Sequence, residues 1–257
     1  MELGITNRVA LVTGAGGGIG RSIALRLVQE GARVVAASRE QAELDSLLTE
    51  LGAPERHHAV RIDFLEDNAP ERLLAEVKRQ VPQIDIVVNN VGGTLDVTDP
   101  FCSLADWHKV MRLNLEVAVE INRLVLPEMQ QRKWGRVVNI ASISGAENHG
   151  PVPYCSAKAA LIAYTRSMGR LVSPDAVIMT AVLPGAVFTE GGYWDTARRE
   201  RPEHVEKYLQ ERMAIHRFGA VEEISSVVAF LCSEAASFCV GSIVPVDGGQ
   251  GRTFFGV

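Results

Sequence analysis

Short apolar runs alternate along the chain with longer stretches in which apolar residues recur at helical spacing. The first run, residues 8–13, contains several β-branched side chains and is followed at once by glycines, a pattern typical of a buried strand in a parallel sheet. The same criteria predict further strands at residues 33–38, 58–63, 84–89, 136–140, 176–183 and 242–246.

Helical segments separate these strands. Apolar spacing, with flanking glycines and prolines, predicts helices at residues 19–31, 44–51, 70–81, 104–133, 154–171 and 221–232. Ser103, with Asp106 three residues later, is the candidate N-cap of the longest helix. Pro127 is expected to kink or break that helix.

Because strand and helix alternate from end to end, the expected fold class is α/β, a Rossmann-like, doubly wound parallel sheet flanked by helices on both faces. No linker divides the chain, so residues 1–257 are predicted to form a single domain. The exception to the alternation is an irregular segment, residues 190–217, whose charges alternate in sign. It is either a solvated helical face or a lid over a site.

Composition narrows the class of protein. The chain has 257 residues, 47% of them hydrophobic, which is ordinary for a globular domain and argues against disorder. A formal charge of −5 without a basic block gives no sign of nucleic-acid binding. No apolar run reaches the length of a membrane span, and the first residues lack the features of a signal peptide. A cytoplasmic protein with four reduced cysteines is expected, and no histidine spacing calls for a metal.

Glycines cluster between the first predicted strand and the first predicted helix, in residues 13–20, which read Thr-Gly-Ala-Gly-Gly-Gly-Ile-Gly. Without side chains the backbone can approach a pyrophosphate closely, and the helix N-terminus supplies N–H donors and a favourable dipole. Tight turns also use glycine, but the strand–turn–helix context favours dinucleotide binding.

The spacing T-G-x-x-x-G-I-G resembles the short-chain dehydrogenase/reductase family. Other matches follow in order: residues 89–92 (Asn-Asn-Val-Gly), Asn114, Ser142, residues 154–158 (Tyr-Cys-Ser-Ala-Lys), 184–189 (Pro-Gly-Ala-Val-Phe-Thr) and 247–249 (Asp-Gly-Gly). The overall pattern is most similar to the 3-oxoacyl-[acyl-carrier-protein] reductase type. The resemblance implies a homotetramer, with residues 104–133, 154–171 and the last strand at the interfaces.

The end of the second predicted strand bears on the choice of cofactor. Ser38 and Arg39 stand there in place of an acidic residue, and a guanidinium matches a phosphate, so NADP(H) is favoured and NAD(H) remains the alternative. Glu40 and a merely surface-exposed Arg39 argue against this choice. The glycine loop and the resemblance together assign cofactor contacts to Gly14, Gly18, Ile19, Gly20, Ser38, Arg39, Asp63, Asn90, Gly92, Tyr154, Lys158, Pro184, Gly185, Val187 and Thr189. Asp63 would either bind adenine or cap nearby backbone N–H groups, and Asp247 is interpreted as a turn residue.

Tyr154 and Lys158 lie four residues apart on a predicted helix and so share one face. Reduction of a carbonyl needs a proton at oxygen, and a nearby ammonium and an oxidised nicotinamide would lower the pKa of the phenol. Ser142, just past a strand, could hold the substrate oxygen, with Ser144 as the rival. The resemblance gives Lys158 a ribose contact and makes Asn114 a helix kink that holds a proton-relay water; a buried, backbone-bonded Asn114 is the alternative.

Several residues are candidates for contact with substrate. His149, in the loop between Ser142 and Tyr154, would either border the substrate or be exposed. Tyr193 and Trp194 would form an apolar wall or anchor the core or an interface. The apolar ending, residues 253–257, would suit a partner subunit or be a frayed tail.

The expected function is therefore an oxidoreductase that transfers hydride between NADP(H) and a ketone or secondary alcohol, such as a 3-oxoacyl or related carbonyl reductase. One alternative is an NAD(P)-dependent sugar, polyol or cyclic-alcohol dehydrogenase. A second alternative is a cofactor-binding regulator without catalysis. The expected partner is a small molecule, without nucleic acid or membrane.

Overall fold

The computed structural model describes residues 2–252. Within this range, seven strands form one parallel sheet in the order β3-β2-β1-β4-β5-β6-β7. The strands are β1 (Val9–Thr13), β2 (Arg33–Ser38), β3 (His58–Arg61), β4 (Ile86–Asn89), β5 (Gly135–Ile140), β6 (Val177–Pro184) and β7 (Ile243–Val246). Strand order reverses between β1 and β4, and in such sheets ligands bind in the crevice outside the carboxyl ends at this point.

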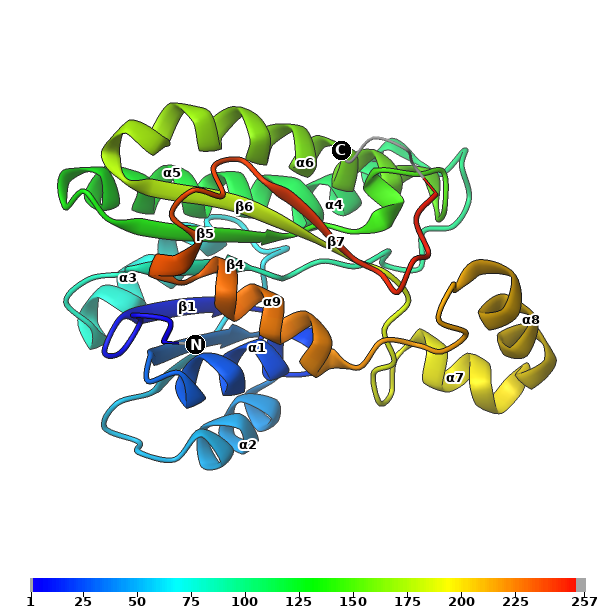
Figure 1. Ribbon diagram of the computed structural model, residues 1–257, viewed down its shortest axis with the longest axis horizontal. Helices are drawn as coiled ribbons and strands as arrows, with labels where there is room; N and C mark the ends of the chain where they lie inside the picture. The colour runs from blue at the N-terminus through cyan, green and yellow to red at the C-terminus, as the bar shows by residue number, and fades with distance from the viewer. Residues whose placement is uncertain (1, 253–257) are drawn as a thin grey trace.

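Helices cover both faces of the sheet, as the alternating pattern predicts (Figure 1). On one face lie α1 (Gly18–Gln29), α2 (Gln41–Leu51) and α9 (Val221–Leu231), and on the other lie α3 (Ala69–Gln80), α4 (Leu104–Met111), α5 (Val117–Gln131) and α6 (Val152–Val172). The α/β doubly wound fold is therefore confirmed. Within residues 2–252 no helix has both the length and the hydropathy needed to cross a membrane.

Alternate residues of the central strand serve two separate cores. In β1, Ala10 and Val12 pack with α1, α2 and α9, whereas Val9 and Leu11 pack with α3 and α5. All four are at most 2% exposed. A strand buried on both faces must be apolar throughout, which is why it reads as a continuous run and not as an alternation.

The long helix predicted at residues 104–133 is interrupted at Asn114, where the family resemblance implies a kink, and not at Pro127. Pro127 lies inside α5 without ending it, so of the predicted kink or break the break is wrong, and the kink stays a prediction. The ring removes one backbone hydrogen bond close to the end of the helix, and the buried neighbours Leu126 and Met129 hold the turn in place. The interruption is instead a π-helical turn, residues Arg112–Glu116, which contains Asn114.

The segment predicted to be irregular, residues 190–217, is mostly helical. It folds into α7 (Tyr193–Glu200) and α8 (Pro202–Arg212), which lie beyond the end of the sheet at which β7 finishes (Figure 1). The alternating charges lie on these helices, which bears out the interpretation as a solvated helical face, and the lid stays a prediction. The expectation of irregular structure was wrong because each helix is short and largely polar, with a single buried residue apiece, so the apolar periodicity is weak. Residues 253–257, the predicted subunit contact, lie outside the described residues.

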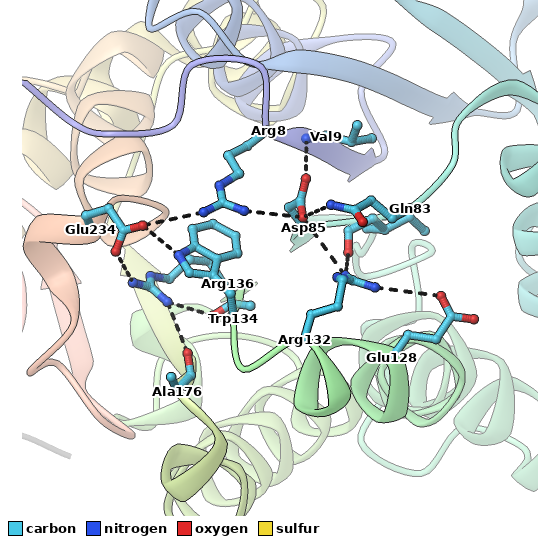
Figure 2. A network of polar contacts seen from close by, with 12 residues as sticks. Arg8, Val9, Gln83, Asp85, Glu128, Arg132, Trp134, Arg136, Ala176 and Glu234 are labelled. Carbon is cyan, nitrogen blue, oxygen red and sulfur yellow. Dashed lines mark hydrogen bonds and ion pairs between the residues drawn. The ribbon is translucent and has the colours of Figure 1, made fainter.

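A network of charged side chains joins the amino ends of β1, β4 and β5, at the edge of the sheet opposite the crevice (Figure 2). The Asp85 carboxylate accepts a hydrogen bond of 3.0 Å from the Val9 N–H and lies 3.7 Å from the Arg8 guanidinium. The guanidinium carbons of Arg8 and Arg136 lie 3.7 and 4.7 Å from the ring centroid of Trp134. This network ties together three strands and the turn after α9, through Glu234.

Candidate active site

A cavity of about 640 Å³ opens at the carboxyl ends of the central strands. It is lined by nearly all the residues to which the sequence assigned a site: Gly14, Ile19, Gly20, Ser38, Arg39, Asp63, Asn90, Gly92, Ser142, Tyr154, Lys158, Pro184, Gly185, Val187 and Thr189. Gly18 and Asn114 are not part of its lining and lie directly behind it, against Thr189 and Gly92 respectively.

The glycine turn after β1 is packed too closely to accept side chains. A Cβ on Gly20 would lie 2.1 Å from the Gly14 carbonyl oxygen, and Gly14 itself adopts a φ of +64°. Asn90, at the end of β4, donates from Nδ2 to the carbonyl oxygens of Thr13 (3.0 Å) and Gly14 (3.1 Å). Asn90 therefore braces the turn from the neighbouring strand.

The N-terminus of α1 fits an anionic group. The helix begins at Gly18 with neither a side-chain cap nor an acidic residue in its first turn. A Cβ on Gly17 would meet no atom within 4 Å, so the backbone there is open to a ligand. Free N–H groups and the helix dipole favour a pyrophosphate at this position, which is what a dinucleotide requires.

The far end of the cavity carries the residues that bear on the choice of cofactor. Ser38 is buried at the end of β2, whereas Arg39 is exposed and lies 3.6 Å from Glu40. Asp63 lines the cavity and also accepts a hydrogen bond of 2.9 Å from the Leu65 N–H. Asp63 therefore caps a backbone N–H group, as one interpretation of the sequence predicts, and at the same time lines the cavity.

Glu43, in the first turn of α2, was missed by sequence reasoning. A Cβ built on Gly16 would lie 2.1 Å from Glu43 Oε2 and 2.7 Å from Ser38 Oγ, so the carboxylate sits at the same corner as Ser38. Nothing in the spacing of residues signals this contact, because Glu43 reads as an ordinary acidic residue near a helix start.

The hydroxyls of Ser142 and Tyr154 meet in the cavity. Ser142 follows β5 and accepts a hydrogen bond of 3.1 Å from the Ser144 N–H, which fixes the turn that carries it. Tyr154 lies in the first turn of α6, and its hydroxyl is close enough to Ser142 for that side chain to lower the pKa of the phenol. Ser144, the rival for the role of Ser142, donates its hydroxyl to the His149 carbonyl oxygen at 2.5 Å and does not line the cavity.

Lys158 lies one helical turn after Tyr154 and is 3% exposed. Its Nζ donates to the Ile140 carbonyl oxygen at 2.8 Å and lies 5.7 Å from the Tyr154 ring centroid. Burial lowers the pKa of Lys158 to about 8. Burial of the phenol raises the pKa of Tyr154 and outweighs the opposite effect of Ser142. The lowering expected when an oxidised nicotinamide lies beside the phenol stays a prediction.

Asn114 is 2% exposed and sits where α4 and α5 are joined by the π-helical turn. Its amide exchanges hydrogen bonds with the Gly93 backbone (3.0 and 2.8 Å) and donates to the Val110 carbonyl oxygen (2.9 Å). A Cβ on Gly92 would lie 2.7 Å from Asn114 Oδ1 and 3.0 Å from Lys158 Nζ. Asn114 is thus both backbone-bonded and at a helix distortion, the two interpretations that the sequence offered.

Aromatic side chains from α7 form the outer wall of the cavity. Tyr193 and Trp194, hereafter the aromatic wall, both line it, with ring centroids 4.9 Å apart at 76°. Trp194 also packs against Tyr208 (4.3 Å) and Phe218 (4.8 Å).

Three side chains distant in sequence tie α8 to the rest of the site. The Tyr208 hydroxyl lies 2.9 Å from His149 Nε2 and accepts a hydrogen bond of 2.5 Å from Gln250 Nε2. Gln250 Oε1 accepts from the Ala186 N–H at 2.8 Å. His149 is half-buried and not exposed, and Asp247 is a turn residue, as predicted, accepting from the backbone of residues 249 and 251. Tyr208 and Gln250 were missed, since no motif links positions so far apart.

Comparison with known proteins agrees with this geometry. The family model for short chain dehydrogenases matches residues 8–198. The chain is 34% identical to a 3-oxoacyl-[acyl-carrier-protein] reductase of Aquifex aeolicus over 97% of its own length and 100% of that protein's. It is also 34% identical to a meso-2,3-butanediol dehydrogenase of Serratia marcescens, over 95% of this chain and 94% of that protein.

A solved structure gives the same result. The L-sorbose reductase of Gluconobacter frateurii, complexed with NADPH and L-sorbose, superposes with a TM-score of 0.92 at 28% identity, covering 99% of this chain and 100% of that chain. With the sheet order, the glycine turn and the Ser142–Tyr154–Lys158 group already in place, the chain belongs to the short-chain dehydrogenase/reductase family of oxidoreductases.

Proposed function

We propose that the chain is a carbonyl reductase that transfers hydride between NADP(H) and a ketone or secondary alcohol, similar to the 3-oxoacyl reductases among its relatives. The observation that carries this proposal is the pair of neighbouring hydroxyls, Ser142 and Tyr154, in the lining of the cavity, together with the buried Lys158. Two converging donors are what a carbonyl oxygen needs as negative charge develops on it.

In this mechanism Ser142 and Tyr154 both donate to the oxygen of the ketone. When bound, NADPH supplies the hydride that forms the new C–H bond as the carbonyl π bond breaks. Tyr154 gives its proton to the oxygen, and the Lys158 ammonium stabilises the phenolate left behind. The Asn114 side chain holds the backbone beside Lys158, where a proton can return to the phenol. Since burial raises the pKa of Tyr154, the phenol is protonated at neutral pH and ready to act as an acid.

The preference for NADP(H) rests on Ser38 and Arg39, which suit a phosphate on the adenosine ribose. Glu43 opposes it, because a carboxylate at the same corner repels a phosphate and accepts from a ribose hydroxyl. Arg39 is expected to outweigh Glu43 once it leaves Glu40, and to give at least a tenfold advantage in kcat/KM for NADPH over NADH. Glu43→Gln should widen that advantage and Arg39→Ala should remove it. Equal efficiency of the two cofactors with the unaltered protein contradicts the preference.

The reductase itself is tested by following NADPH absorbance with a set of ketones, for the unaltered protein and for Tyr154→Phe. Loss of an acid group should reduce kcat by about 10²–10⁴-fold while cofactor binding persists. Equal turnover by the variant contradicts the mechanism. Absence of turnover with every ketone, despite measurable NADPH binding, would favour a regulator without catalysis.

A sugar or polyol oxidoreductase is the second candidate. It is favoured by the similarity to the L-sorbose reductase, with a TM-score of 0.92, and to the butanediol dehydrogenase. The same assay separates the two candidates, because it includes ketoses and apolar ketones side by side.

A further inference from the structure

The distribution of charge in the cavity bears on what its substrate carries. Among the described residues that line it, the charged side chains are Arg39, Asp63 and Lys158. Arg39 and Asp63 stand beyond the ends of β2 and β3, on the adenosine side in the proposed mode of binding. Lys158 is buried and holds the Ile140 carbonyl oxygen. No charged side chain of the lining is left to pair with a carboxylate or phosphate beside Ser142, and an unpaired charge is costly to desolvate.

Two polar side chains on the loop between β5 and α6 are engaged within the protein. The Ser144 hydroxyl donates to the His149 carbonyl oxygen, and the His149 ring is paired with the Tyr208 hydroxyl. The other polar side chains that follow Ser142 on this loop, Glu147 and Asn148, do not line the cavity, so the loop offers the hydroxyl groups of a sugar few partners there. A buried hydroxyl without a partner weakens binding.

The aromatic wall faces the same space. Trp194 is half-buried and supported from behind by Tyr208 and Phe218, so its position is fixed by ring packing. Tyr193 is 60% exposed at the mouth. Together the two rings present a broad apolar surface that gains free energy only if a ligand covers it.

The wall is also fixed relative to the cofactor side of the cavity. Gln250, 6% exposed, bonds with one amide atom to the Ala186 N–H, within the stretch 184–189, and with the other to the Tyr208 hydroxyl. Tyr208 in turn packs its ring on Trp194. These contacts, which run from Ala186 through Gln250 and Tyr208 to Trp194, therefore set the distance between residues 184–189 and the aromatic wall.

We infer that the substrate is an uncharged ketone, or the matching secondary alcohol, whose carbonyl meets Ser142 and Tyr154 and whose apolar substituent packs on the aromatic wall of Tyr193 and Trp194. This inference rests on the proposed reductase function and selects, within it, apolar ketones over oxoacids and ketoses. Trp194 is the residue that determines this specificity, and Tyr208 and Gln250 position it.

Two comparisons test the inference with NADPH and the unaltered protein. Ethyl 3-oxobutanoate carries an uncharged ethyl ester where 3-oxobutanoate carries a carboxylate, and the ester is expected to have at least a tenfold higher kcat/KM. Ethyl 3-oxo-3-phenylpropanoate has a phenyl ring on the ketone carbon in place of the methyl group of ethyl 3-oxobutanoate. Its KM is expected to be several-fold lower than that of ethyl 3-oxobutanoate. L-sorbose serves as the hydroxylated ketone and is expected to be the poorer substrate.

Variants locate the effect in the wall. The preference is the kcat/KM for ethyl 3-oxo-3-phenylpropanoate divided by the kcat/KM for ethyl 3-oxobutanoate. Trp194→Ala should reduce this ratio by about tenfold through a higher KM for the phenyl compound, and Trp194→Phe should restore most of it. NADPH binding, measured by calorimetry, checks that the variants are folded. Phe238→Ala, which removes an aromatic ring that is 99% exposed, is the control and should leave the ratio unchanged.

The outcomes are separable. Efficient turnover of 3-oxobutanoate or L-sorbose relative to the esters overturns the inference and leaves the reductase intact, as does a ratio that Trp194→Ala does not alter. No turnover of any ketone overturns the reductase and the inference with it. Preference for the esters, lost in Trp194→Ala and recovered in Trp194→Phe, supports the inference.

Discussion

Among single residues, Lys158 carries the clearest conflict between stability and function. Its ammonium is buried with one carbonyl partner, and this burial lowers its pKa from 10.5 to about 8. A group whose pKa is lower in the folded than in the unfolded protein weakens folding at pH values below both pKa values. At neutral pH the charge on Lys158 therefore opposes folding, while the same charge is what the mechanism requires.

Lys158→Met should accordingly abolish turnover and stabilise the protein without cofactor. The shift from 10.5 to about 8 corresponds to roughly 3 kcal/mol at pH 7 as an upper bound, since the variant also loses the bond to Ile140. The gain should be constant below pH 8 and shrink between pH 8 and about 10.5, where the folded protein releases the proton first. Urea unfolding at several pH values measures it. A variant less stable than the parent at pH 7 would show that the lysine is well solvated.

Gly92 is the second residue whose exchange is informative. A methyl group there would meet Asn114 Oδ1 at 2.7 Å and Lys158 Nζ at 3.0 Å, so Gly92→Ala should displace both and lower kcat by about tenfold or more. Gly93→Ala is the matched control for stability, because a Cβ at that position meets nothing within 4 Å. Thermal unfolding and steady-state kinetics of the two variants give the comparison. Similar losses in both would mean that backbone freedom, and not the contact with Asn114 and Lys158, is what matters.

At the scale of helices and loops, the Tyr208 hydroxyl joins α8 to His149 and Gln250. Tyr208→Phe keeps the ring packed on Trp194 and removes these bonds, so the wall should become mobile without losing its apolar surface. We expect a three- to tenfold higher KM for the ketone, with kcat and the Kd for NADPH within about twofold. Tyr193→Phe removes the hydroxyl of an exposed residue of the same wall and should leave KM, kcat and the Kd for NADPH unchanged. A fall in kcat with unchanged KM would place Tyr208 in the chemical step instead.

The elements also show where sequence reasoning succeeds and fails. Buried strands and their glycine turn are fixed by local chemistry, so β1, the turn at Gly14 and the pair Tyr154–Lys158 could be predicted. The family resemblance implies a distortion of the long helix at Asn114, whereas helix propensity alone points to Pro127. Propensity cannot register the bonds of Asn114 to Gly93, because they come from tertiary contact. Glu43 and Gln250 were missed for the same reason: their partners are remote in sequence or are backbone atoms.

Across the whole molecule, the carboxyl ends and the amino ends of the strands, here called the carboxyl edge and the amino edge of the sheet, differ in function. The carboxyl edge holds several glycines, which lose much conformational freedom on folding, and a buried ammonium, and both reduce stability. The amino edge holds the network around Asp85, in which a carboxylate at 4% exposure is paired with Arg8 at 3.7 Å and Arg132 at 4.0 Å (Figure 2). We interpret this network as a clamp on β1, β4 and β5, the strands that carry the turn at Gly14, Asn90 and Ser142.

Asp85→Asn tests this division between the edges. The amide can still accept from the Val9 N–H, but it leaves two guanidinium groups without their shared buried charge, and removing one partner of such a group is strongly destabilising. Because Arg8 and Arg132 remain partly hydrated, at 31% and 28% exposure, we expect a loss of about 2 kcal/mol and a Tm lower by about 4–8 °C. KM values at temperatures well below the transition should not change, since the clamp lies at the opposite edge from the cavity.

Glu128→Gln is the matched control, because Glu128 is 44% exposed and its ion pairs, with Arg132 at 4.0 Å and with Lys78 at 2.5 Å, lie at the surface, where such pairs contribute little. It should change the free energy of unfolding by less than about 1 kcal/mol. Denaturant unfolding followed by tryptophan fluorescence measures both variants, and Trp134, stacked within the network, is one of the three tryptophans that contribute to the signal. Asp85→Asn could instead weaken NADPH binding without changing stability. That result would show that the two edges are coupled through β1 and β4, and that the network acts on the cofactor site and not on the stability of the sheet.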